Sequence, residues 1–168
     1  MSDVRRLSNF ISRTVSGPMW HGPALSDLLK DVSPSDAVAR PIPTAHSIME
    51  IVLHMAAWAE IAHARLGSTP IGEPTAAEEW PPVKGKSKAN WQDALNRLYG
   101  SYRELSEDAA NLDLKQLRRI IPGRDHSAQE MLHGIIEHGT YHGGQIALIK
   151  RALTAVAAAR PTGEVAEH

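Results

Sequence analysis

The chain has 168 residues, and its charges nearly cancel, with 18 lysines and arginines against 19 aspartates and glutamates. No block of like charge occurs, so the sequence lacks the basic footprint of a nucleic-acid-binding protein. It contains no cysteine, which excludes disulfides, a cysteine nucleophile and thiolate metal ligands. No run of about 18 apolar residues occurs, and the N-terminus lacks the apolar segment of a secretory signal. We therefore expect a cytoplasmic protein with neither a nucleic-acid nor a membrane partner.

Apolar residues recur at helical spacing in four long stretches, and capping residues mark the start of some of them. Ser87 precedes the third stretch, and Ser127 with Glu130 gives the S-x-x-E pattern of a capping box before the fourth. No alternating, strand-like pattern occurs. In chain order, we expect helices over 3–16, about 23–32, 45–66, 88–111 and 128–158, with a loop at 33–44 and a single helical turn at 113–117.

The segment between the second and third long helices is unusually long. Residues 67–87, GSTPIGEPTAAEEWPPVKGKS, contain four prolines and three glycines, and long connections of this kind are often functional. Glu78, Glu79 and Trp80 either cover the mouth of a pocket or pack as an ordinary loop. Four long helices with one long crossing connection predict an all-α four-helix bundle, formed by a single domain over residues 1–168.

The most informative pattern is H-x-x-x-H near the C-terminus, formed by His138 and His142. Four residues advance a helix by about 400°, so both imidazoles lie on one face and can reach one metal ion. The neighbouring residues are apolar or small, and Gln145 is a third polar group on this face. Buried polar groups need partners, which a metal ion would supply. The alternative is that the two histidines face solvent or form hydrogen bonds within the core.

A third ligand is expected from a neighbouring helix. His54 lies among apolar residues in the most hydrophobic helix, where a histidine is either a hydrogen-bonded core residue or a ligand. A common site explains both His54 and the H-x-x-x-H pair. Three neutral histidines and a water would form an open site for a divalent ion such as zinc or nickel. This is the form of a catalytic centre, because structural zinc sites usually have four protein ligands.

Glycines surround the histidine pair, at Gly139, Gly143 and Gly144. Each costs up to about 1 kcal/mol in an exposed helix. Their presence indicates either close helix packing or room for ligands beside a buried site.

Two stretches, PIPTAHSIMEIVLHMAAWAE and MLHGIIEHGTYHGGQIALIKRAL, together resemble the DinB-like (YfiT-related) metalloprotein superfamily over roughly residues 3–157. The specific features are a histidine followed four residues later by tryptophan, and the H-x-x-x-H pair with Gly-Gln-Ile after it. The resemblance implies an up-down-down-up four-helix bundle with its long crossover at 67–87, and a metal ion held by His54, His138 and His142. Characterised relatives include S-transferases that use bacillithiol, mycothiol or glutathione, and a mycothiol-dependent maleylpyruvate isomerase. Many members have no assigned reaction, and dimers are common, so a homodimer is expected.

Four further residues are candidates around this centre. Glu50 lies one turn before His54, and it either serves the site as a base, an orienting group or a ligand, or forms a salt bridge. Gln145 is a candidate partner of a metal ligand and Tyr141 a candidate pocket residue, with core packing the alternative for each. His21, in the segment WHGPA, would contact substrate or cofactor if that segment crosses one end of the bundle.

The sequence therefore favours a metal-dependent enzyme that acts on a small-molecule substrate, most concretely an S-transferase that joins a low-molecular-weight thiol to an electrophile. The lack of cysteine fits a thiol supplied by a cofactor. A protein that binds a metal or small ligand without catalysis, used in stress responses, is the alternative from another class. A metal-dependent hydrolase is a further alternative, in which the metal would activate water.

Overall fold

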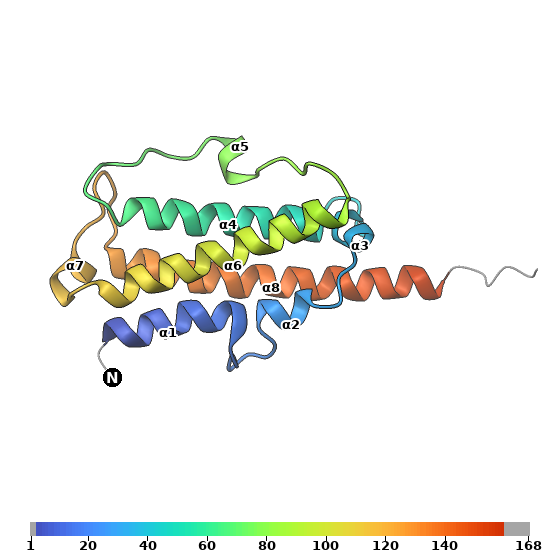
Figure 1. Ribbon diagram of the computed structural model, residues 1–168, viewed down its shortest axis with the longest axis horizontal. Coiled ribbons are helices and arrows are strands. Elements are labelled where there is room, and N and C mark those ends of the chain that lie inside the picture. The colour runs from blue at the N-terminus through green and yellow to red at the C-terminus, as the bar shows by residue number, and fades with distance from the viewer. Residues whose placement is uncertain (1–2, 160–168) are drawn as a thin grey trace, which may run out of the picture.

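The computed structural model describes residues 3–159, and over that range the protein is all-α, as the sequence predicts. Residues 1–2 and 160–168 of the predicted domain lie outside the described range. No helix in the described part of the chain is long and apolar enough to span a membrane. Four long helices lie side by side (Figure 1): α1 (Asp3–Ser16), α4 (Ile48–Arg65), α6 (Lys88–Asn111) and α8 (Ala128–Ala158). The short helices are α2 (Leu25–Leu29), α3 (Pro34–Val38), α5 (Ala76–Glu79) and α7 (Leu114–Arg118).

The four long helices enclose one core, because α1 and α4 each pack against both α6 and α8. In Figure 1, α4 and α6 run in the same direction, and α1 and α8 run in the opposite one. A chain that leaves the end of α4 must therefore return along the bundle before α6 can begin. The segment between these helices does so beside α4, and it carries the short helix α5 partway along.

The helix α4 begins three residues later than predicted. The Ser47 hydroxyl accepts a hydrogen bond from the Glu50 backbone N–H at 3.3 Å, and the Glu50 carboxylate accepts one from the Ser47 backbone N–H at 2.7 Å. This capping box starts the helix at Ile48 rather than Ala45. The predicted boundary was wrong because it followed the apolar pattern and overlooked the cap.

The loop predicted at 33–44 contains a short helix, α3. The Ser33 hydroxyl caps it by accepting a hydrogen bond from the Asp36 backbone N–H at 3.1 Å. Pro34 occupies the first helical position, where its missing N–H has no partner to lose. The helix predicted at about 23–32 spans only Leu25–Leu29, so Pro34 does not end it and instead begins α3.

The helix α4 lies at the centre of the core. Ile48, Val52 and Met55 have no exposed surface, and Met49 and Ile51 are 1% exposed. Buried side chains cover more than one stripe of this helix, because it packs against two long neighbours. The same packing places His54 in the interior, at 4% exposed.

Among Gly139, Gly143 and Gly144, only Gly139 lies so close to neighbouring helices that a larger side chain would collide with them. A Cβ added there would lie 2.4 Å from Thr14 Cγ2 of α1 and 3.1 Å from Tyr102 Oη of α6. At Gly144 an added Cβ would meet no atom within 4 Å. Close packing of three helices therefore explains Gly139, and it does not explain Gly144.

We expect opposite effects from alanine at these two positions. Gly139→Ala should lower the free energy of unfolding by about 1–3 kcal/mol, because Thr14 or the backbone must move to admit the methyl group. Gly144→Ala should raise it by up to about 1 kcal/mol, because alanine favours the helix and meets open space. Urea unfolding followed by circular dichroism measures both. Equal effects of the two substitutions would contradict the packing explanation.

Candidate metal site

Three histidines meet where α4 packs against α8. His54 comes from α4, and His138 and His142 come from successive turns of α8. The Nε2 atom of His138 lies 3.0 Å from Nε2 of His54 and 3.0 Å from Nε2 of His142. One ligand atom from each residue lies within 4.8 Å of the other two. The predicted grouping of these three residues is confirmed.

The outer nitrogens of two imidazoles have partners that define their tautomers. The His54 Nδ1 atom lies 2.8 Å from the backbone oxygen of Glu79. A carbonyl oxygen only accepts hydrogen bonds, so Nδ1 carries the proton and Nε2 keeps a free lone pair. His142 is arranged in the same way, with Nδ1 2.7 Å from Oε1 of Gln145. Both residues therefore direct an unprotonated nitrogen toward His138.

Burial keeps the imidazoles neutral. It lowers the pKa of His138 to about 3, helped by the neighbouring His142 and His54. Burial also lowers the pKa of His142 to about 4, against an opposing effect of its hydrogen bond to Gln145, and it lowers the pKa of His54. Neutral histidine is the form that binds metals. At neutral pH no proton has to leave these side chains before a metal ion binds.

The donor set fits a divalent metal ion. Free Nε2 lone pairs of His54 and His142 converge on His138, which has one proton and can donate it to only one of them. The outer Nδ1 of His138 is buried and has no hydrogen-bond partner. A cation at the convergence point would satisfy the inward lone pairs together. No carboxylate of residues 3–159 belongs to this group, so the group offers three nitrogen donors, the number that open zinc sites use.

The connection between α4 and α6 covers the site with an aromatic side chain. The Trp80 ring stacks on His54, with centroids 3.8 Å apart, and on His46, with centroids 3.7 Å apart. It also meets the His142 ring edge-on at 6.4 Å. Trp80 therefore packs on the histidine group, and it is not among the residues that line the cavities of the structure described here. In the sequence, the feature that pointed to this residue was a single tryptophan in a proline-rich connection.

Glu50 is not brought to the histidines. Its carboxylate accepts hydrogen bonds from the backbone and the hydroxyl of Ser47, each at 2.7 Å, and pairs with Arg40. These contacts lower the pKa of Glu50 against the opposing effect of burial. The expected place beside the metal ligands is therefore corrected to a capping position, which the S-x-x-E pattern at Ser47 already signalled.

Gln145 and Tyr141 lie beside the histidine group, and His21 does not. The Gln145 amide joins the two neighbours, since its oxygen accepts from His142 and its nitrogen donates to the Tyr141 hydroxyl at 3.0 Å. Tyr141 is 64% exposed and meets the His142 ring edge-on at 5.0 Å. His21 lines a separate cavity of about 190 Å³ with Gly139 and Gly143, and none of the three clustered histidines lines it.

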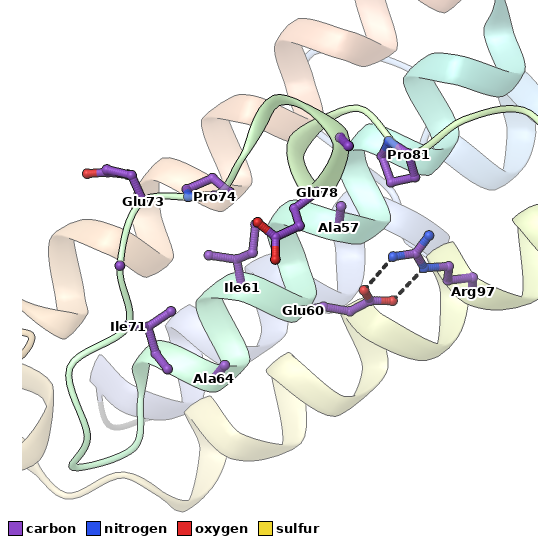
Figure 2. A pocket seen from close by; sticks show the side chains of 12 residues that line it. Ala57, Glu60, Ile61, Ala64, Ile71, Glu73, Pro74, Glu78, Pro81 and Arg97 are labelled. Atoms are coloured by element: carbon purple, nitrogen blue, oxygen red, sulfur yellow. Dashed lines mark hydrogen bonds and ion pairs between the residues drawn. The ribbon is translucent and has the colours of Figure 1, made fainter.

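A larger cavity opens beside the histidine group. It has a volume of about 440 Å³, and His138 of α8 and Trp58 of α4 form part of its wall. The Trp58 ring meets His138 and His54 edge-on, at centroid distances of 6.2 and 6.5 Å. A different cavity, of about 500 Å³, lies between the connection and helices α4 and α6 (Figure 2), and the clustered histidines do not line it. Of these three cavities, the one at His138 adjoins the histidine group.

Comparison with known families identifies the class of protein that this fold and site define. The model of the DinB superfamily matches residues 20–146, well over half of the chain. The protein belongs to the DinB superfamily. Comparisons with curated proteins and with solved structures gave no significant match.

We expect the purified protein, made without a histidine tag, to bind about one zinc or nickel ion per chain. His54→Ala and His142→Ala should each abolish stoichiometric binding, because each removes one of three ligands from a different helix. His133→Ala is the matched control, since His133 is an exposed histidine of α8. Elemental analysis after incubation with each ion and desalting measures the content. Equal metal content in all four proteins would place the ion elsewhere.

Proposed function

We propose that this protein is a metal-dependent S-transferase, which joins the sulfur of a low-molecular-weight thiol to a small electrophile. The observation that supports this most directly is that His138 belongs to the histidine group and also lines the cavity of about 440 Å³. A zinc or nickel ion held by three histidines keeps a position for an outside ligand and would lower the pKa of a thiol bound there. The cavity provides the space for that thiol and for its reaction partner.

The reaction forms a C–S bond and breaks two bonds, the S–H bond of the thiol and the bond between the electrophilic carbon and its leaving group. The thiol loses its proton to solvent, and the thiolate sulfur then donates an electron pair to the electrophilic carbon. A C–S bond forms while the leaving group departs from that carbon with its electron pair. Since the chain has no cysteine, the thiol must come from a separate molecule.

The protein's own residues hold and shield the reacting groups. Gln145 fixes the ring of His142 through its Nδ1 atom, and the Glu79 backbone oxygen does the same for His54. Trp80 and Trp58 pack around the imidazoles with apolar ring surface. They keep water from much of the site, which favours attack by the thiolate over attack by water.

Gln145 is proposed as a positioning residue, and its removal should weaken metal binding. Gln145→Leu deletes the acceptor for His142 Nδ1–H, and loss of such a partner typically costs roughly 10–100-fold in metal affinity. Competition with a chromogenic chelator measures that affinity. Tyr141→Phe is the control, because the Tyr141 hydroxyl contacts the Gln145 amide and not the imidazole nitrogens. An unchanged affinity in Gln145→Leu would remove this role.

The proposed activity is tested with a panel of thiols and one reporter electrophile. Metal-loaded protein is mixed with bacillithiol, mycothiol or glutathione and with chlorodinitrobenzene, whose conjugation to sulfur changes its absorbance. We expect thioether formation above the spontaneous rate with at least one thiol, and its loss on chelation or in His54→Ala.

Two other results, the first from an added assay with an ester substrate, would reject the proposal in distinct ways. Turnover of an ester by the metal-loaded protein without any thiol would indicate a metal-dependent hydrolase. Stoichiometric metal with no turnover of either kind would indicate a protein that binds a metal or a small ligand without catalysis.

A further inference from the structure

The cavity beside His138 has a positively charged end. Arg65, from the last turn of α4, and Arg124, from the loop between α7 and α8, line it together with Trp58 and His138. Arg65 follows His54 by eleven residues, which is close to three helical turns, so both side chains start from the same face of α4. One cavity therefore joins a metal-ligand histidine to two guanidinium groups.

Arg65 is an almost completely buried cation. It is 5% exposed, and its guanidinium carbon lies 5.7 Å from the centroid of the Trp58 ring. It donates to the backbone oxygen of Gly72 and to Glu73 Oε2, each at the long distance of 3.3 Å, and its buried Nε has no partner. Burial and the nearby Arg124 lower the pKa of Arg65. A guanidinium remains charged in proteins, so this buried cation is only weakly partnered.

Arg124 is also incompletely hydrogen-bonded, and it pairs with the other oxygen of the Glu73 carboxylate. Its side chain is 12% exposed, donates to the Ile71 backbone oxygen at 2.7 Å and pairs with Glu73 Oε1. Its Nε atom is also buried and without a partner. The carboxylate of Glu73 therefore serves two guanidinium groups, which leaves one positive charge uncompensated by this contact. Asp125 also lines the cavity, but its side chain is fully exposed and pairs with His126.

Glu73 reaches the arginines from the connection and is itself 72% exposed. Figure 2 shows its side chain pointing away from the Glu60–Arg97 pair and from the other side chains of the α4–α6 cavity. The backbone oxygens of Ile71 and Gly72 keep their own contacts to Arg124 and Arg65. The Glu73 side chain can therefore swing into solvent while the connection stays bound to both arginines.

We propose that Arg65 and Arg124 form a subsite for the carboxylate group of a ligand, and that Glu73 occupies this subsite when the ligand is absent. A guanidinium matches a carboxylate because its planar fork donates two parallel hydrogen bonds. Two arginines around one carboxylate position hold more N–H donors than Glu73 uses, and the unpartnered Nε atoms show that neither guanidinium is fully hydrogen-bonded. The subsite thereby selects ligands with a negative charge at the end remote from the metal.

The placement of the reactive end rests on the proposed function. The Trp58 ring centre lies 5.7 Å from the Arg65 guanidinium carbon and 6.2 Å from the centre of the His138 ring, so the guanidinium and this imidazole lie within about 12 Å of each other. A ligand whose carboxylate lies at the arginines would reach the histidine group with an atom roughly that far away. The carboxylate belongs either to the thiol or to the electrophile, and binding measurements distinguish the two.

Calorimetric titration of the full-length protein tests the subsite. The probes are hexanoate and hexanol with metal-free protein, and mercaptohexanoate and mercaptohexanol with zinc-loaded protein. We expect each acid to bind at least about tenfold more tightly than its alcohol, the scale of a charge-assisted hydrogen bond. Arg124→Gln should remove this preference, and Glu73→Gln should strengthen acid binding because it removes the competing charge. Arg119→Gln is the control, since Arg119 bonds the Leu66 and Gly67 backbone oxygens outside the cavity.

Equal affinities for an acid and its alcohol would overturn the proposed subsite. So would a preference for the acid that neither Arg124→Gln nor Glu73→Gln changes. Inorganic phosphate that competes as strongly as hexanoate would overturn its assignment to carboxylates. An acid preference with carboxylated electrophiles but not with mercaptohexanoate would assign the charge to the electrophile and uphold the subsite. The variants Arg124→Gln and Glu73→Gln carry the test even if substitution of buried Arg65 prevents folding.

These results separate the subsite from the activity. Normal zinc content and mercaptohexanol binding in Arg124→Gln, with loss of acid preference alone, would show that the subsite is distinct from the metal centre. Acid preference in a protein that forms no thioether would leave the subsite standing and reject the transferase.

Discussion

The packing of α4 against α8 is the constraint on which the site depends, because it brings a histidine of the most buried helix against two histidines on successive turns of another. Burial there has two effects on the same side chains. It lowers the pKa of each imidazole, so that all three are neutral at neutral pH. It also removes water that would otherwise satisfy their nitrogens, so that only the single proton of His138 or a cation can serve the inward lone pairs. Outward hydrogen bonds to Glu79 and Gln145 then set which nitrogen is free.

The connection between α4 and α6 is as much a part of the site as the helices. Since these two helices run in the same direction, the chain must travel back along the bundle (Figure 1), and on the way it stacks Trp80 on His54 and contributes Glu73 to the lining of the cavity. Its Trp80 ring stacks on His54, and its Glu79 backbone oxygen accepts a hydrogen bond from the same imidazole. Its Glu73 carboxylate accepts hydrogen bonds from Arg65 and Arg124. A topological requirement of the fold thus brings one segment against both the histidine group and the two arginines of the cavity. Residues that distinguish ligands are therefore expected in this connection as well as in the helices.

Particular residues show why some predictions succeeded and others did not. The H-x-x-x-H spacing was sufficient for His138 and His142, because helix geometry alone places residues four apart on one face. Glu50 has the same spacing from His54, yet its carboxylate caps the helix and pairs with Arg40, because a helix N-terminus offers it backbone donors at short range. His21 lies in a cavity on another side of α8 from a segment whose path no periodic pattern describes. Arg65 and Arg124 were not predicted as site residues, because long charged side chains are usually exposed.

The sequence by itself determined the all-α fold, the extents of the four long helices to within a few residues, the family and the three histidines, because each depends on spacing within a helix or on a local cap. Only the tertiary structure decided the tautomers of His54 and His142, the cover formed by Trp80, the close approach that requires Gly139, and the joining of Arg65, Arg124 and Glu73 in one cavity. These features are contacts between residues far apart in the chain. They depend on how helices and connection pack in three dimensions, and helical periodicity carries no information about such distances.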